Sequence, residues 1–356
     1  MKRIKKKNIL LIIYTLVSLF GFYSLGLPSL LGEIPIQTYS DSLRYEYFSK
    51  NLYDELPLIS FASNMFGPVY ILRFFDYNYI YIYMFNITIF YISIKLILEN
   101  HNLKSNVLLF FLFMSPLMYF SLFNVNKEIL TLLSISLFTV YIKNLKLRYL
   151  ILSLFVAFMV KWQLVIFLIF AAVSVVVIKK RYLRFLSVLS LILILSIAYP
   201  ILAKTVLLKV VEHSHGSVDI STTGSGIFPL LNNIQTHYGG YIIAVIPKFL
   251  QINFGIIARI EMLGTPAHFW NYFVLLLHSV IFFLLFLLFI YKKGYKINND
   301  LYYVSILYIA FFAITPIINV RYFFPVYIFW IIIISQSYTN SRLVKNENIA
   351  HHRKFR

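Results

Sequence analysis

Long apolar runs alternate with short polar segments along most of the chain. A helix of about 20 residues crosses the hydrocarbon core of a bilayer, and several of the runs approach that length. The pattern predicts an all-α fold, a polytopic transmembrane helical bundle of about ten spans. The runs lie at about 9–31, 77–98, 106–122, 129–142, 149–160, 163–178, 185–207, 272–291, 301–319 and 323–338.

The segment 149–178 allows two interpretations. It is apolar apart from Lys161, Trp162 and Gln163, and a basic cluster flanks it on each side. If both clusters are cytoplasmic, the segment crosses the membrane twice and Lys161 lies at or near the outer tip of a hairpin. One long tilted helix would instead leave four basic residues outside. The charge pattern favours the hairpin.

Composition and charge agree with a membrane protein. Hydrophobic residues make up 60% of the chain and charged residues 13%, whereas soluble domains carry about 25% charged residues. With the ten spans assigned, the cytoplasmic segments hold 22 of the 32 Lys and Arg and three of the 13 acids. We therefore interpret the net charge of +19 as a sign of membrane topology, with both termini cytoplasmic. It does not indicate a nucleic-acid partner.

Two predicted outer segments are long, at about 32–76 and 208–271. The second contains YIIAVIPKFLQINFGII, in which Pro247 and Lys248 interrupt an apolar stretch, and this predicts an interfacial or re-entrant helix. The first apolar run exceeds the length of a signal-peptide core, so we interpret it as a retained helix. No internal repeat is visible, and we expect a single membrane domain over residues 1–356. Cysteine is absent, which excludes disulfides and thiol catalysis.

The first outer segment offers a candidate base. Asp41 lies in SDSLRYEYF, with Arg44 and Tyr45 close by. A partly desolvated carboxylate can take a proton from an acceptor hydroxyl. The alternative is structural: Ser40 or Asp41 caps a short helix.

Two further candidates are lysines beside the predicted outer ends of spans. Lys127 and Glu128 open one span, where Glu128 also suits the helix dipole and Lys127 can extend to lipid headgroups. Lys161 interrupts an apolar segment, and a buried ammonium group there needs an anionic partner such as a phosphate.

The remaining candidates lie late in the chain. Arg321 and Tyr322 occupy a very short outer turn, where arginine can bind phosphate through two hydrogen bonds or act as an ordinary interfacial residue. Arg259 lies in the second outer segment and can line the mouth of a cavity. His213 and His215 precede Asp219 in a spacing that rarely holds a metal, so we expect no metal site and no cofactor.

Several of these features occur together in one superfamily. They are an early Asp in the first outer loop, a Gly-Pro stretch entering the next span, a Lys-Glu pair opening a later helix and a terminal Arg-Tyr-x-x-Pro. Over about 36–98, 115–165 and 318–330, the chain resembles the GT-C glycosyltransferases and the Wzy-type and EpsG-like surface-polysaccharide polymerases. The acid after Asp41 that would complete a pair is absent, since Ser42 follows, and the late outer loop lacks an arginine-rich repeat.

The resemblance implies a function and partners. The expected reaction transfers a sugar or oligosaccharide from a polyprenyl-phosphate-linked donor to a glycan acceptor, at the outer face of a bacterial cytoplasmic membrane. The site would comprise Asp41 as base and Lys127, Lys161 and Arg321 as phosphate ligands. Other polysaccharide-assembly proteins are possible partners.

Three other functions stay open on the sequence alone. A flippase or transporter of lipid-linked sugars usually shows internal pseudo-symmetry, which this chain lacks. A membrane O-acyltransferase usually depends on a histidine in or near a span, and His278 is the one mid-span histidine of the predicted bundle. A scaffold without catalysis would have no need for Lys161.

Overall fold

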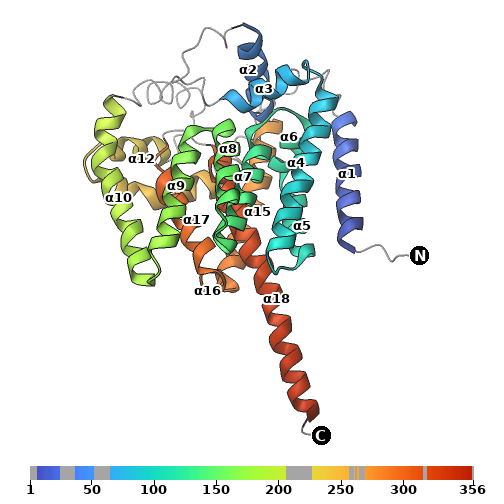
Figure 1. The fold of residues 1–356 in the computed structure, drawn as a ribbon. Helices are drawn as coiled ribbons and strands as arrows, with labels where there is room; N and C mark the ends of the chain where they lie inside the picture. The colour runs from blue at the N-terminus through green and yellow to red at the C-terminus, as the bar shows by residue number, and fades with distance from the viewer. Residues whose placement is uncertain are drawn as a thin grey trace. The chain divides into compact units, whose positions relative to one another are not determined.

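The computed structural model describes residues 6–24, 37–51, 65–205, 227–255, 260, 263, 269–315 and 319–354 (Figure 1). These residues are helical or lie in short connections, and none of them forms a strand, which confirms the all-α class. In chain order the helices are α1 (Lys6–Ser24), α2 (Gln37–Asn51), α3 (Phe66–Phe74), α4 (Tyr79–Asn100), α5 (Ser105–Met114), α6 (Pro116–Phe123), α7 (Lys127–Asn144), α8 (Leu147–Val160), α9 (Trp162–Val177), α10 (Arg181–Lys204), α12 (Ile227–Gln235), α13 (Gly240–Phe254), α15 (Phe269–Tyr291), α16 (Gly294–Ile297), α17 (Asn299–Phe312), the 3₁₀ helix η4 (Val320–Phe323) and α18 (Phe324–Lys354).

The chain folds into two compact units. The first unit comprises Met1–Ile169, Leu285–Tyr302 and Ile328–Arg356, and the second comprises Phe170–Leu284 and Tyr303–Tyr327. The chain therefore enters each unit more than once, and α9, α15, α17 and α18 each contribute residues to both.

Four described segments are long and apolar enough to cross a bilayer: Tyr79–Asn100, Arg181–Lys204, Tyr272–Tyr291 and Val320–Thr339. The pair α5 and α6 makes a fifth if it crosses as one element, although it bends by 72°. The bend falls at Ser115–Pro116, where proline disfavours a helical conformation in the residue before it. The other apolar helices are shorter, so the total of about ten spans stays a prediction.

The distribution of side chains supports a lipid environment for these helices. On α10, Phe185, Ile194 and Ile197 are 68%, 62% and 60% exposed, although water would disfavour such a surface. Between α7 and α8, by contrast, Ser134 and Ser153 are buried and each hydroxyl donates to the other residue's carbonyl, at 3.0 and 2.8 Å. Small hydroxyl residues at helix contacts are typical of membrane bundles. The chain is a helical membrane protein.

The segment 149–178 is not one continuous helix. Lys161 has an extended backbone (φ −171°, ψ 141°) and separates α8 from α9. This break confirms that the lysine interrupts the segment, as the hairpin requires. The crossing of the membrane by both arms stays a prediction.

In the second unit, α12 and α13 form a tight helical hairpin. Gly239 has a φ of +80°, which favours glycine, and a Cβ on Gly240 would lie 1.9 Å from the carbonyl oxygen of Ile234. The helix predicted over YIIAVIPKFLQINFGII is present as α13, which continues through Pro247, and its interfacial or re-entrant position stays a prediction.

One predicted span end was wrong, and the last predicted span lies in a helix longer than the span itself. The run at 301–319 forms a helix only to Phe312, because Pro316 follows closely and lacks the N–H that a helix needs. The last run, predicted at 323–338, agrees with the candidate span Val320–Thr339. Its helix α18 continues beyond the span to Lys354, since no proline or glycine interrupts 326–354.

The topology can be tested with two matched single cysteines, because the chain has none. Asn51 ends α2 and Asn144 ends α7, and both side chains are exposed. We expect Asn51→Cys to react with an impermeant thiol reagent in intact cells and Asn144→Cys to react only after the membrane is permeabilised. Labelling of Asn144→Cys in intact cells would contradict the predicted orientation.

A buried histidine in the first unit should make stability depend on pH. His101 follows α4 and is 5% exposed, and burial, with a smaller effect of Lys143, lowers the pKa of its imidazole to about 4. The unfolded chain, with a histidine pKa of about 6.5, takes up the proton first as pH falls. The free energy of unfolding should therefore decrease between about pH 6.5 and 4, by at most roughly 3 kcal/mol.

Thermal unfolding of the purified protein at pH 8 and pH 5 measures this effect. His101→Gln should remove this part of the pH dependence, whereas His237→Gln, at an exposed position, should keep it. An unchanged pH dependence in His101→Gln would show that His101 does not cause it.

Candidate functional site

The helix α2 carries the first group of predicted site residues. It begins at Gln37, so Asp41 lies one turn inside the helix, and the alternative in which Ser40 or Asp41 caps the helix is wrong. The side chains of Asp41 and Arg44 lie outside the described part of the structure, while Tyr45 is 5% exposed. The structure thus gives the position of the Asp41 backbone and not that of its side chain.

Two contacts attach α2 to the start of α7. The Ser42 hydroxyl donates to the carbonyl of Val125 over 3.0 Å, and both residues are buried. One turn along α2, the ring of Tyr45 lies 5.4 Å from the Lys127 ammonium nitrogen, close enough for a cation–π interaction. The neighbour of Asp41 therefore lies against the chain that leads into Lys127 and Glu128.

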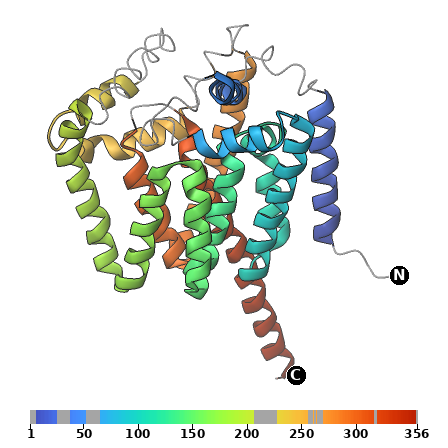
Figure 2. The same ribbon diagram turned by 45° about the horizontal axis from the view of Figure 1, so that its top comes forward.

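The helix α3 connects this region to the end of α8. Figures 1 and 2 show α3 lying across the ends of neighbouring helices of the first unit instead of along them. A Cβ on Gly67 would lie 2.3 Å from the Met159 carbonyl and 2.8 Å from Leu130 Cδ1, so only glycine permits this approach. Met159 and Leu130 are two and three residues from Lys161 and Lys127, so the N-terminal end of α3 lies near the backbone of both lysines. A cluster of buried apolar residues that includes part of α3 comprises Tyr45, Met65, Phe66, Val69, Leu72, Tyr79, Ile82 and Val125.

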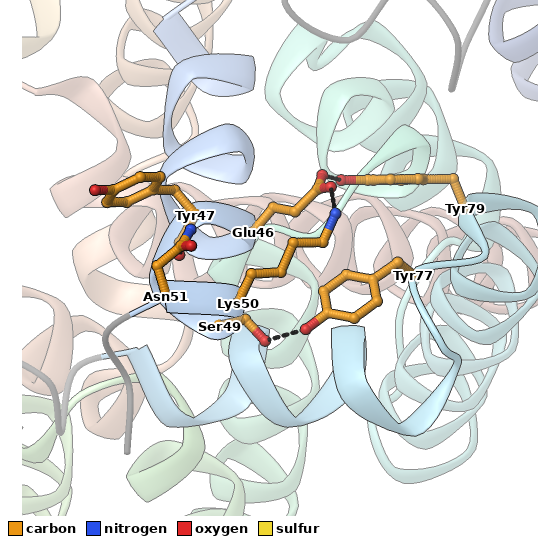
Figure 3. A network of polar contacts seen from close by, with 7 residues as sticks. All are labelled: Glu46, Tyr47, Ser49, Lys50, Asn51, Tyr77 and Tyr79. Carbon is orange, nitrogen blue, oxygen red and sulfur yellow. Dashed lines mark hydrogen bonds and ion pairs between the residues drawn. The ribbon is translucent and has the colours of Figure 1, made fainter. Parts of the chain in front are cut away.

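A polar network holds the other end of α2 (Figure 3). Glu46 accepts hydrogen bonds from Lys50 at 2.7 Å and from the hydroxyl of Tyr79 at 2.6 Å. Burial alone would raise the pKa of the Glu46 carboxyl, but these hydrogen bonds and the charge of Lys50 bring it below its ordinary value. Ser49 bonds the hydroxyl of Tyr77 at 2.8 Å. These partners satisfy one another, so we interpret the network as structural.

The junction between α6 and α7 contains asparagines that the sequence analysis did not single out. Asn86, on α4, donates its buried amide to the carbonyls of Ser121, Leu122 and Asn124, at 3.2, 3.1 and 2.9 Å. Asn124 and Asn126 are themselves buried, and Asn126 precedes α7 without making the usual side-chain cap. The signal in the sequence was the pair of asparagines in FNVNKE, directly before the predicted span.

The late candidates belong to the second unit. The backbone N–H and Nε of Arg321 both donate to Asn319 Oδ1, at 3.0 and 3.2 Å, and the carbonyl of Tyr322 accepts from Tyr308 at 2.8 Å. The turn that holds Arg321 is therefore stabilised by Asn319 within it and by Tyr308 of α17. Its approach to Lys127 and Lys161 of the first unit stays a prediction, and Arg259 lies outside the described residues.

A buried lysine in the second unit was missed as a candidate. Lys248 is 0% exposed, and its ammonium donates to Gln235 Oε1 at 2.7 Å and to the carbonyl of Thr315 at 2.6 Å. Gln235 also donates to the carbonyl of Ile314 at 3.1 Å. These bonds attach the α12–α13 hairpin to the chain after α17. The sequence signal was a lysine beside Pro247 inside an apolar stretch.

Neither a metal centre nor a relative identifies the site. Among the residues that the structure describes, no three His, Asp or Glu side chains come together as a metal site would require, and His213, His215 and Asp219 lie outside them. Comparison with protein-family models, curated proteins and solved structures finds no match to this chain. The resemblance to GT-C enzymes and polysaccharide polymerases therefore stays a prediction.

The role of Lys248 as an anchor gives a stability prediction. Lys248→Met keeps the apolar stem but leaves the buried acceptors Gln235 Oε1 and Thr315 O without this donor. We expect the free energy of unfolding to fall by about 1–3 kcal/mol. Thermal unfolding in detergent measures the change, with Lys204→Met at the exposed end of α10 as the control. Equal melting temperatures for the two variants would exclude the anchoring role.

Proposed function

We propose that this protein transfers a glycosyl group from a polyprenyl-phosphate-linked donor to a glycan acceptor, with the reaction centred on α2, α3 and the adjoining ends of α7 and α8. The observation that carries the proposal is the attachment of α2 to the start of α7 through Ser42 and Tyr45. This attachment brings the helix of the candidate base Asp41 beside the candidate cation Lys127. Two groups that the reaction needs are thus on adjacent elements.

The reaction assigns a different task to each group. An acceptor hydroxyl attacks the anomeric carbon of the donor, the bond from that carbon to the phosphate oxygen breaks, and the hydroxyl proton passes to the Asp41 carboxylate. Lys127 and Lys161 stabilise the negative charge that accumulates on the departing phosphate. The N-terminus of α7 adds to this effect, because the N-terminus of a helix favours anions. No metal or cofactor is part of the proposal.

The lengths of the helices fit a substrate held in lipid. The 14 residues of α8 rise by about 21 Å, less than the hydrocarbon thickness of about 30 Å. An α8 that starts at the cytoplasmic surface therefore ends, with Lys161 beyond it, before the opposite surface is reached. A shallow apolar groove along α4, near the same end of the unit, is lined by Phe75, Tyr81, Met84, Phe85 and Thr88. It offers an apolar surface to a prenyl chain.

The rival functions are less well supported. An O-acyltransferase would need an accessible histidine, but His278 is 0% exposed and its ring packs 5.6 Å from that of Tyr327 and 5.9 Å from that of Phe282. A flippase of lipid-linked sugars shares the substrate but needs no base. We propose that the enzyme acts in the cytoplasmic membrane of a bacterium, in the synthesis of a surface polysaccharide, as a repeat-unit polymerase that works alongside other assembly proteins.

The proposal predicts that Asp41→Asn decreases turnover by about 10²–10⁴-fold, the usual contribution of a general base. The measurement is sugar transfer by the purified protein in nanodiscs supplied with a polyprenyl-phosphate-linked donor. Glu46→Gln is the matched control, since it removes one acid from the same helix at a residue bonded to Lys50 and Tyr79. It should lower the melting temperature and leave turnover within a fewfold of wild type.

Two results would count against the proposal. Wild-type turnover in Asp41→Asn would leave the enzyme without its base. Translocation of the lipid-linked sugar without transfer would instead identify a flippase.

A further inference from the structure

The junction between α6 and α7 carries two buried amides that fold stability does not explain. Asn124 is 0% exposed and Asn126 is 2% exposed. For both residues, the side-chain Nδ2 and Oδ1 atoms make no hydrogen bond in the described structure. A buried polar atom without a partner destabilises the folded state, and an apolar side chain of similar size would avoid this cost.

The position of Asn126 makes the missing bonds more informative. An asparagine directly before a helix usually accepts a hydrogen bond from one of the first N–H groups of that helix. Asn126 precedes the 18-residue helix α7 and makes no such bond, so its own amide is not used as a helix cap. Asn86 meanwhile holds the carbonyl of Asn124 at 2.9 Å, which keeps the junction in place. The side-chain amides of Asn124 and Asn126 therefore lie at this junction without forming hydrogen bonds that would stabilise the fold.

The hydrogen-bonding capacity of the two amides defines the ligand. Each amide has donor hydrogens on Nδ2 and acceptor lone pairs on Oδ1. A phosphate group only accepts, so it would leave both Oδ1 atoms unpaired. The hydroxyl groups of a sugar donate and accept, and they satisfy both atoms. A sugar attached to a phosphate also fits the rest of the junction, since Lys127 and the N-terminus of α7 favour an anion.

We propose that Asn124 and Asn126 bind hydroxyl groups of the sugar that the lipid donor carries, with the donor phosphate beside Lys127 at the start of α7. This inference rests on the proposed function and adds the residues that recognise the sugar. Because the amide atoms are closed to solvent, binding requires the chain that covers them to move. Ser42, which bonds the carbonyl of Val125 between the two asparagines, lies on one helix that closes the junction.

The test compares binding of lipids with and without a sugar. The probes are undecaprenyl phosphate and the same lipid carrying glucose, galactose or N-acetylglucosamine, titrated against the protein in nanodiscs. We expect wild type to bind at least one sugar-bearing lipid roughly tenfold or more tightly than undecaprenyl phosphate. Asn124→Leu and Asn126→Leu should each remove this preference and leave the affinity for undecaprenyl phosphate unchanged. Lys127→Met should weaken binding of all four lipids.

A second readout does not depend on the lipids. Because the amides destabilise the fold, Asn124→Leu and Asn126→Leu should raise the melting temperature or leave it unchanged. Asn253→Leu is the matched control: Asn253 is also buried and its Oδ1 likewise makes no hydrogen bond in the described structure, but its Nδ2 donates to the carbonyl of Phe249 at 2.8 Å. It should lower the melting temperature or leave it unchanged, without altering the sugar preference. If leucine is too large at either site, Asn124→Ala and Asn126→Ala replace these variants in the lipid titration.

The outcomes separate this inference from the proposed function. Equal wild-type affinity for all four lipids would overturn the sugar site and leave a phosphate site intact. A sugar preference that survives both asparagine substitutions would place recognition elsewhere and also overturn it. Failure of wild type to bind any of the lipids would overturn the proposed function together with the inference. A large fall in melting temperature for Asn126→Leu would show that its amide stabilises the fold.

Discussion

The first unit depends on the hydrogen bonds that Asn86 makes at the end of α6. Its amide donates to three backbone carbonyls within 3.2 Å. Two of them belong to the last turn of α6, where carbonyls have no partner inside the helix, and the third belongs to Asn124 just beyond it. Lipid supplies no hydrogen bonds, so a helix that ends within a membrane unit needs a side chain for this purpose. The bond at Asn124 holds the junction to α7, and the junction in turn receives α2 through Val125. Asn86 therefore holds the junction against which α2 packs.

In the second unit, side chains also supply hydrogen bonds to backbone carbonyls that follow a helix. The chain after α17 offers the carbonyls of Ile314 and Thr315, which accept from Gln235 and Lys248. Both side chains come from the α12–α13 hairpin, so a single hairpin satisfies the end of a helix that lies far from it in sequence. A buried ammonium is costly in an apolar setting and is retained where it binds such carbonyls.

Polar residues of the first unit divide into two kinds. Glu46, Lys50 and Tyr79 satisfy one another and attach α2 to α4, so their role is complete in the folded protein. The side-chain amides of Asn124 and Asn126 are buried and take no part in such bonds within the described structure. The first kind lies toward the C-terminal end of α2 and the second flanks Val125, which Ser42 contacts nearer the N-terminal end. This contrast separates residues that build the site from residues available to a ligand.

The sequence by itself determined the class of the protein, the approximate positions of most helices and the break at Lys161. These features depend on local hydrophobicity and on proline and charge positions, which are visible without any contact partner. It also marked Tyr45, Lys127 and Glu128, but as separate positions. Only the tertiary structure decided that Ser42 and Tyr45 meet the start of α7, because contacts between residues about 80 positions apart follow from packing and not from local pattern. For the same reason, burial showed which asparagines lack partners: an amide in a sequence looks the same whether or not the fold satisfies it.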